Sequence, residues 1–328
     1  MHNCLKRNKK ILSTLIKILI GFGSFGIICM RLETDLTAER LQLLSEAARA
    51  GGSVAAIFTG LLLIPVNWGI EAYKWQIITA PVHKVNYLTA SKSVYSGVCL
   101  GNLAPGRATE FMAKIIYFPA ETRPGIAVLH FISGMFQLGI TLWCGLAAFL
   151  LFFHNFAEQT EWIIWTTGIS AIVLIAALVL CICNINKLLD AASKKFSADR
   201  NAPLVNYHFS TTLLVQLFSF SLIRYFIFYC QFALALSIFY KGNFTLPVFS
   251  GIALYFLITT ALPMISIFEP AVRAAVALIV FSNTDISSAA VALSSVIIWL
   301  ANIIIPSIAG YYFLLQQNFN FKLFRYSK

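Results

Sequence analysis

Residues 102–110 read Asn-Leu-Ala-Pro-Gly-Arg-Ala-Thr-Glu, which places a proline–glycine break and two opposite charges inside a long apolar segment. A second stretch, residues 262–273, reads Leu-Pro-Met-Ile-Ser-Ile-Phe-Glu-Pro-Ala-Val-Arg and repeats this arrangement. A charge at the centre of a bilayer costs about 2.5–3.5 kcal/mol or more, so such residues are expected to face a partner, a cavity or water. The two stretches therefore predict interrupted helices that serve a function within a membrane.

The composition of the whole chain predicts the class of protein. The 328 residues are 59% hydrophobic and 11% charged, with a mean hydropathy of +0.79, whereas a soluble domain is about 25% charged. Apolar segments of roughly 20 residues, the length that crosses a hydrocarbon core, recur between Ile11 and Leu315. We expect one all-α polytopic membrane domain over residues 1–328, with short polar connections.

Charge and cysteine content argue against several other classes. The net charge of +11 comes from Lys and Arg in short connections, which indicates orientation in a membrane and not nucleic-acid binding. The seven cysteines are odd in number and lie mostly in apolar segments, which argues against a disulfide framework. The sequence contains no His-Glu-x-x-His, Gly-x-Ser-x-Gly or phosphate-loop motif. We expect no metal, no cofactor and no hydrolytic activity.

The positions of Lys and Arg predict how the chain crosses the membrane. Six full spans are expected, at about 11–30, 53–75, 125–153, 162–183, 209–240 and 287–315. Residues 85–118 and 245–282 are expected to form two broken re-entrant helix pairs, open to the cytoplasm and to the outside respectively. Residues 31–49 connect the first two spans. The rule that cytoplasmic connections are basic places both termini, Lys84 and Lys195 in the cytoplasm of a cell membrane, with Glu158 and Asp285 outside.

The order of these segments predicts an internal repeat. Residues 1–153 read as span, span, broken pair and span, and residues 154–328 read as the same series in the opposite orientation. Inverted repeats bring discontinuous helices together near the bilayer midplane, where half-helix ends and unwound backbone contact the substrate. We therefore expect a substrate-binding site between the two breaks.

The charges at both breaks are candidate substrate-binding residues. Arg107, Glu110 and Lys114 share one face if the segment after the first break is helical. A shallow half-helix whose basic side chains reach the cytoplasmic headgroups is the alternative. At the second break, Glu269 stands at or near the N-cap of a helix, with Arg273 one turn later. The alternative there is a purely structural ion pair.

A central arginine on the fifth span is a further candidate. Arg224 has Gln216 and Gln231 on roughly the same face, and it must face a cavity, an anionic ligand or a carboxylate. Pairing with a glutamate of the bundle is the structural alternative. A weaker polar stripe on the third span, interpreted as interhelical hydrogen bonding, comprises His130, Gln137 and Thr141.

The second span carries a comparable polar stripe near its cytoplasmic end. Asn67, Glu71 and Lys74 are spaced at helical intervals, flanked by Trp68 and Trp75. Tryptophan is enriched at membrane interfaces, so these two are expected to mark the headgroup level, with Lys74 anchoring the helix end there. Asn67 and Glu71 are kept as candidate substrate-binding residues.

Four groups of residues together resemble the flippase-like membrane region of the lysylphosphatidylglycerol synthetases. They are Asn67-Trp68-x-x-Glu71-x-x-Lys74-Trp75, Asn102-x-x-Pro105-Gly106-Arg107-x-x-Glu110, Arg224-Tyr225 in a long span, and Glu269-x-x-Val272-Arg273 after a proline break. The resemblance covers nearly the whole chain and is most specific in the broken segments. Thr109 replaces a glycine common in relatives, and Glu269-Pro270-Ala271 replaces a glycine-richer turn.

The resemblance implies movement of lipids across the membrane. Two-domain relatives add a soluble aminoacyl-transferase domain that makes the lipid, whereas this chain resembles only the membrane region, so lipid synthesis is not implied. The leading hypothesis is a flippase that moves an amphiphilic, anionic lipid or lipid-linked intermediate through a polar cavity at the midplane. An intramembrane transferase acting on a lipid carrier and a non-transporting scaffold for envelope synthesis are the alternatives. Membrane lipids are the expected partners, besides a second copy of the chain or envelope-synthesis enzymes.

Overall fold

The computed structural model describes residues 22–33, 37–102, 107, 109–154, 209–262 and 264–317, with isolated residues at 15 and 19 and between 168 and 187. Every regular element in these residues is a helix, so the all-helical fold expected from the sequence is confirmed. Four helices of the described part are long and apolar enough to cross a membrane, namely Gly51–Thr79, Ala120–Leu151, Thr211–Phe239 and Ser288–Leu315. The mean hydropathy of the chain therefore reflects long apolar helices.

These helices lie where the second, third, fifth and last spans are expected. They are α3 (Gly51–Thr79), α6 (Arg123–His154), α9 (Thr211–Phe239) and the run formed by α12 (Ser288–Trp299), η4 (Leu300–Ile304) and α13 (Ile305–Leu315). Of the first expected span the structure describes an apolar helix over Phe22–Leu32. Most of the fourth, residues 162–183, lies outside the described residues, as do Glu158 and Lys195.

Both broken segments consist of two shorter helices. The first contains α4 (Tyr87–Gly101) and α5 (Glu110–Ile115), and the second contains α10 (Leu246–Ala261), a short 3-10 turn, η3 (Ser266–Phe268), and α11 (Glu269–Val280). Side-chain oxygens of Asn86, Ser210 and Ser287 cap α4, α9 and α12 by accepting backbone N–H bonds. The breaking residues Pro105, Gly106 and Pro263 lie outside the described residues.

The connection after the first span differs from the expectation. Residues 38–49 were expected within a plain connection but form a helix, α2 (Ala38–Arg49). The segment is rich in Ala, Leu and Glu, which are strong helix formers. Because α2 is polar on average, it is not a membrane span.

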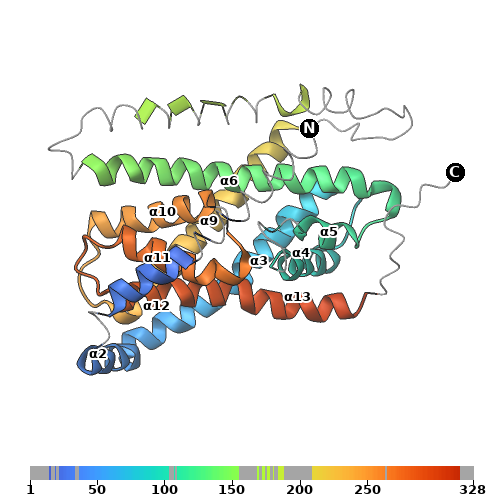
Figure 1. The fold of residues 1–328 in the computed structure, drawn as a ribbon. Coiled ribbons are helices and arrows are strands. Elements are labelled where there is room, and N and C mark those ends of the chain that lie inside the picture. Colours follow the sequence, from blue (N-terminus) through green and yellow to red (C-terminus); the bar gives the residue numbers. More distant parts are fainter. Residues whose placement is uncertain are drawn as a thin grey trace.

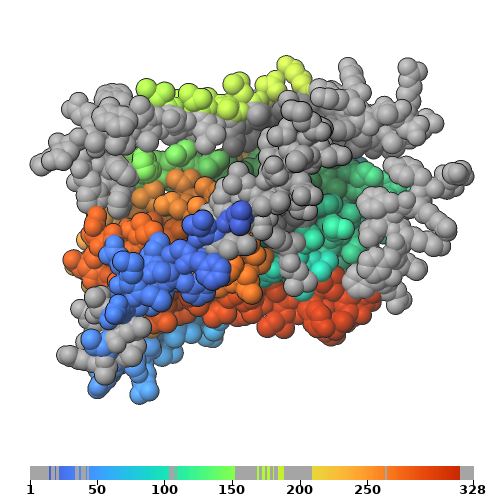
Figure 2. Space-filling model, in the orientation of Figure 1, coloured from blue at the N-terminus to red at the C-terminus, as the bar shows by residue number. Residues whose placement is uncertain are grey.

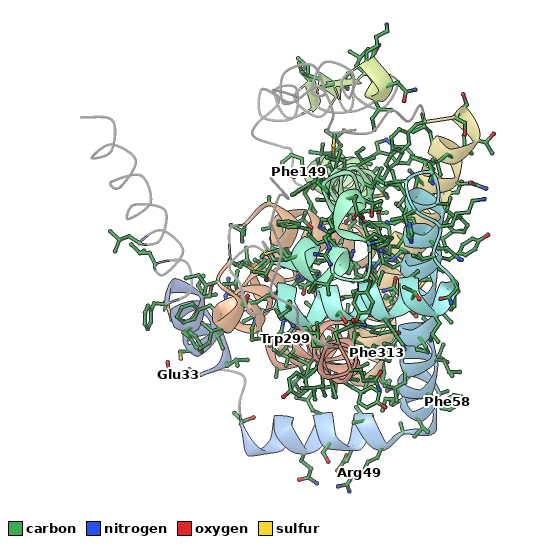
Figure 3. All side chains as sticks on the ribbon, turned by 90° about the vertical axis from the view of Figure 1, so that its right-hand side faces the viewer. Glu33, Arg49, Phe58, Phe149, Trp299 and Phe313 are labelled. Atoms are coloured by element: carbon green, nitrogen blue, oxygen red, sulfur yellow. The ribbon has the colours of Figure 1, made fainter. Side chains whose placement is uncertain are left out.

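The broken segments enter the bundle from opposite ends. Figure 1 shows α4 and α5 at the right-hand end and α10 and α11 at the left-hand end, with α6 and α13 along opposite sides. Viewed from one end of the bundle, α6 and α13 again lie apart with the shorter helices between them (Figure 3). The main contacts join α3 to α9, α6 to α10 and α13 to α4. Each long terminal helix thus packs on the broken segment of the other half.

Glycines permit these two close approaches. A Cβ on Gly310 of α13 would overlap the backbone carbonyl of Tyr95 in α4. A Cβ on Gly145 of α6 would overlap the side chain of Leu257 in α10. Both helix pairs therefore pack closely through a small residue, against the backbone of α4 in one pair and against a side chain of α10 in the other, as is common among membrane helices.

The outer faces of the long helices are apolar. Phe58, Phe131, Phe226 and Ile308 are each more than half exposed and belong to four different long elements. Isolated exposed hydrophobic residues are ordinary, but a whole set of them on helices of spanning length fits contact with acyl chains. The helix that contains Phe22 covers one face of the bundle and is shown in blue in Figure 2. The ring of Phe22 packs against the ring of Phe268.

Candidate functional site

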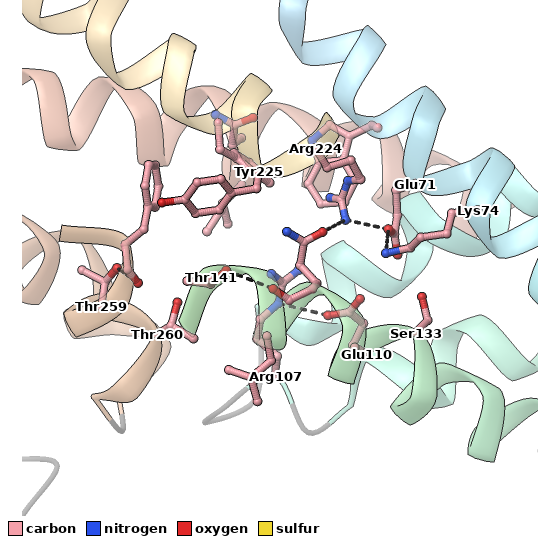
Figure 4. A pocket seen from close by; sticks show the side chains of 18 of the residues that line it. Glu71, Lys74, Arg107, Glu110, Ser133, Thr141, Arg224, Tyr225, Thr259 and Thr260 are labelled. Carbon is pink, nitrogen blue, oxygen red and sulfur yellow. Dashed lines mark hydrogen bonds and ion pairs between the residues drawn. The ribbon is translucent and has the colours of Figure 1, made fainter. Parts of the chain in front are cut away.

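A cavity of about 550 Å³ lies inside the bundle, between the two breaks. It is lined by side chains of α3, α5, α6, α9, α10, α11 and the α12–η4 run, and by Arg107 before α5. Six of the eight predicted substrate-binding residues line it, namely Glu71, Arg107, Glu110, Lys114, Arg224 and Arg273. Asn67 and Glu269 do not line the cavity, but each contacts a residue that does. Asn67 accepts a hydrogen bond from Arg224, and Glu269 pairs with Arg273. Figure 4 shows several of these side chains converging from different helices.

Glu71 is the centre of the charge network. Its Oε2 lies 2.6 Å from Arg224 Nη1 and 2.9 Å from Lys74 Nζ, and its Oε1 lies 3.6 Å from Lys114 Nζ. All four side chains are buried. One carboxylate of α3 therefore contacts three cations, which come from α3, α5 and α9.

Arg224 is held in place from several directions. Its Nε donates a hydrogen bond to Asn67 Oδ1 at 3.1 Å, and its Nη1 donates to Gln137 Oε1 at 3.3 Å. The guanidinium also lies over the rings of Trp68 and Phe228, each 5.5 Å from the ring centroid. Planar stacking combined with directed hydrogen bonds fixes the orientation of an arginine side chain.

The expectation that Lys74 and the tryptophans mark the membrane interface is wrong. Lys74 is 1% exposed, and its Nζ donates to Ser221 Oγ at 3.3 Å in addition to pairing with Glu71. Trp75 is fully buried, and its indole N–H donates to Ser93 Oγ at 3.0 Å. Trp68 lines the cavity. The stripe faces inward because cationic, hydroxyl and amide groups of other helices pair with it there.

Arg107 adopts an unusual backbone conformation at the first break. Its φ of 56° lies in the left-handed region, which non-glycine residues seldom adopt. Arg107 is therefore not part of the helix that was expected to carry Arg107, Glu110 and Lys114 on one face. That helix, α5, begins at Glu110. Arg107 Nε still lies 3.1 Å from Glu110 Oε2, and Lys114 Nζ lies 3.1 Å from Glu110 Oε1. Strained conformations of this kind persist where the surroundings hold them, and they cluster at functional sites.

Thr109 links the two helices of the first break. Its hydroxyl donates to the backbone carbonyl of Leu100, near the carboxyl end of α4. Carbonyls at a helix end need an outside donor, and a glycine at position 109 would supply none from its side chain. The threonine thus ties the two halves of the first break together.

The second break carries an ion pair. Arg273 Nε donates to Glu269 Oε1 at 2.9 Å, and Nη2 lies 2.8 Å from the same oxygen. Glu269 is the first residue of α11 and directly follows the N-cap residue Phe268, which agrees with its expected place at or near the N-cap. The carboxylate points along the helix toward Arg273, which lines the cavity.

Sequence reasoning missed a polar residue on the last long helix. Asn302 is buried, lines the cavity, and its Oδ1 lies 3.5 Å from Asn67 Nδ2. It belongs to the π-helical turn η4, which precedes Pro306; because proline lacks an N–H, the helical bond to the carbonyl four residues earlier cannot form. The available signal was a lone asparagine in an apolar run, four residues before a proline.

The other polar side chains expected on interior faces lie in three different environments. His130, Gln137 and Thr141 line the cavity as one face of α6. Gln231 is buried and donates to the carbonyl of Gly60 instead. Gln216 is exposed, because a residue eight positions before Arg224 lies about 80° away around the helix.

The arrangement offers many N–H donors to an anion inside an apolar bundle. Among the described residues, no group of three or more His, Cys, Asp or Glu side chains could hold a metal ion. The side chains that line the cavity supply guanidinium, ammonium and amide groups, which form ion pairs and hydrogen bonds. No protein-family model matches this chain, and no curated protein matches it in sequence.

Proposed function

We propose that this protein moves an amphiphilic, anionic lipid or lipid-linked intermediate across the cell membrane, with the headgroup passing through the charged cavity. The observation that carries the proposal is the lining itself. Arg107, Arg224 and Arg273 come from both breaks and a central helix, and they share the cavity with the apolar side chains of Phe228 and Phe256. A cavity that combines buried cations with aromatic walls suits a molecule that is partly charged and partly apolar.

The packing of the two halves supports an inverted repeat, residues 1–153 and 154–328. In Figure 1, α6 runs from right to left after the first break, and α12 to α13 run from left to right after the second. Each of these terminal helices packs against the broken segment of the other half, through Gly145 and Gly310 respectively. Exchanging the two halves therefore preserves the main contacts, which is the arrangement that inverted-repeat transporters use for alternating access.

The mechanism follows from the ion pairs. In the empty cavity Glu71, Glu110 and Glu269 neutralise part of the positive charge. A headgroup phosphate competes for the guanidinium groups of Arg107, Arg224 and Arg273, and planar guanidinium binds phosphate in a bidentate manner. The breaks enter from opposite ends, so small movements of the two halves would expose the cavity first to one side and then to the other. The lipid tails stay in the bilayer.

The resemblance to the flippase-like region of lysylphosphatidylglycerol synthetases agrees with this proposal. Its quoted residues include Glu71, Arg224 and Arg273, which lie in or on the cavity. The proposal includes a multi-pass position in the cell membrane with both termini in the cytoplasm, and membrane lipids as the partners. The exposed apolar faces of the long helices support the membrane position.

Reconstitution into liposomes tests the proposal directly. Vesicles containing fluorescent phosphatidylglycerol, phosphatidic acid or phosphatidylcholine are treated with a membrane-impermeant quencher, which bleaches only the outer leaflet. We expect wild-type protein to expose inner-leaflet anionic lipid to the quencher, whereas protein-free vesicles do not. The proposal is wrong if no lipid in the panel moves faster than in protein-free vesicles. A new covalent lipid product, detected by mass spectrometry, would favour a transferase instead.

A further inference from the structure

The charges around Glu71 do not balance. The cluster contains four cations, Lys74, Arg107, Lys114 and Arg224, and two carboxylates, Glu71 and Glu110. Its formal charge is therefore two positive units. Among the described residues, no further carboxylate pairs with any of these four cations.

Three of these four cations are buried, and the fourth, Arg107, lines the cavity with 38% of its side chain exposed. Lys74, Lys114 and Arg224 are 1%, 2% and 6% exposed. Taking an uncompensated ion out of water costs several kcal/mol, so a buried group of charges approaches neutrality through partners or bound counter-ions. The Arg273–Glu269 pair on the opposite wall is neutral as a unit and does not change this count.

Unused donors face the same space. Arg107 Nη2 is buried without a hydrogen-bond partner among the described residues, and Arg107 Nε lies close to Glu110 without the alignment of a hydrogen bond. Ser133 Oγ and His130 Nδ1 are likewise buried without described partners, and both residues line the cavity. Ser133 is only 3% exposed. Buried polar atoms are usually satisfied, so this group indicates a ligand with several acceptor oxygens.

We propose that the headgroup bound in this cavity is a dianion, a phosphate monoester or diphosphate, in preference to a singly charged phosphodiester or a zwitterion. A phosphate monoester carries about −1.5 to −2 charges at pH 7 and three strong acceptor oxygens, which matches both the charge and the free donors. A phosphodiester leaves one positive unit of the cluster without a counter-charge. A cationic headgroup adds to the repulsion. This inference rests on the proposed function, since it names the class of headgroup that is carried.

The size of the cavity agrees with this ligand. A volume of about 550 Å³ accommodates a phosphorylated headgroup, whereas whole lipid chains are much larger. Phe228 and Phe256 provide apolar wall beside the charged residues, where the first carbons of a lipid tail or prenyl chain can rest. The chains then continue into the bilayer.

Binding to the purified full-length protein tests the inference. Trp68 and Trp299 line the cavity, so tryptophan fluorescence reports occupancy. The probes are dihexanoyl phosphatidic acid, dihexanoyl phosphatidylglycerol, dihexanoyl phosphatidylcholine and inorganic phosphate. We expect phosphatidic acid to bind about tenfold more tightly than phosphatidylglycerol at pH 8, because one further charge pair forms inside the protein. This preference should decline toward pH 5, because the second ionisation of a phosphate monoester has a pKa near 6.

The matched variants are Lys114→Gln and Lys84→Gln. Removing Lys114 leaves Glu110 paired with Arg107 and leaves Glu71 paired with both Arg224 and Lys74, so no carboxylate is orphaned and the fold should persist. The excess charge falls to one unit, and the preference for phosphatidic acid should fall to about one. Lys84 is exposed and outside the cavity, and its replacement should change nothing.

The outcomes separate this inference from the proposed function. Equal affinity for phosphatidic acid and phosphatidylglycerol in the wild type would overturn the dianion preference, even if liposomes show lipid movement. A preference for phosphatidic acid without movement of any lipid would overturn the proposed function and leave the dianion site in place. Inorganic phosphate binding as tightly as phosphatidic acid would show that the dianion is a soluble ion and overturn its assignment to a lipid.

Discussion

Glu71 is the residue on which the charge network depends most strongly. It contacts three buried cations, and no other carboxylate of the described chain reaches Arg224 or Lys74. We predict that Glu71→Gln lowers the free energy of unfolding by about 3–5 kcal/mol, because it leaves buried charges without a partner. Thermal unfolding of the purified protein measures the loss. Glu121→Gln is the control, since Glu121 is exposed and makes no described ion pair.

The double variant Glu71→Gln, Arg224→Gln identifies the origin of that loss. Removing both members of the 2.6 Å pair restores the net charge of the cluster but leaves Lys74 without a carboxylate, so part of the lost stability should return. An unfolding temperature for Glu71→Gln equal to that of the wild type would show that the cations need no carboxylate.

At this scale the sequence reveals charged residues but not their partners. Arg107, Arg224 and Arg273 are recognisable because arginine is costly inside an apolar segment. Lys74 is ambiguous, since a long basic side chain can reach the headgroups or turn inward, and only packing decides which. Asn302 was missed because one amide in an apolar run is weak evidence until its partner, Asn67, is known.

Among the elements, the contact between α4 and α5 determines where Lys114 lies. A Cβ added to Gly97 would come within 2.9 Å of Lys114 Cγ and 3.2 Å of Glu110 Cγ. We predict that Gly97→Ala displaces the Lys114 side chain and weakens binding of phosphatidic acid several-fold. The free energy of unfolding should change less than the binding does, because alanine favours a helix more than glycine does.

Gly60→Ala is the matched control for this prediction. Gly60 lies inside α3, and a Cβ there meets nothing within 4 Å. Binding measured by tryptophan fluorescence should stay at the wild-type value for Gly60→Ala. Unchanged binding in Gly97→Ala would mean that the position of Lys114 does not matter for the ligand.

The positions of the two breaks could be predicted because the effect of proline on a helix is local, so the sequence alone shows where it occurs. Pro270 is the second residue of α11 and Pro306 is the second residue of α13, and the first turn of a helix is where proline is favoured. The left-handed backbone of Arg107 could not be predicted, since it depends on how α5 is held against α4. The helix α2 was missed because its polar average composition is also that of a connection between spans.

For the whole molecule, the orientation in the membrane is a prediction that labelling can test. Lys84, Lys92 and Arg123 flank the first break, on the side that the excess of basic residues assigns to the cytoplasm. Single cysteines are placed at residue 84 or residue 285 of a cysteine-free variant and treated with an impermeant reagent. A cysteine at residue 285 should be labelled in intact cells. A cysteine at residue 84 should be labelled only after the membrane has been opened. External labelling at residue 84 with residue 285 protected would reverse the topology.

The central claim is that charges from both halves form one site that carries a lipid headgroup. The double variant Arg273→Gln, Glu269→Gln tests it most directly, because the two residues form a neutral pair and their joint removal leaves no buried charge without a partner. The measurement is the rate of lipid movement in liposomes that contain this variant, after its unfolding temperature and vesicle insertion are shown to match those of the wild type. We predict that the folded double variant fails to move anionic lipid. Wild-type transport by that variant would contradict the claim, because the second break would then serve only to begin a helix.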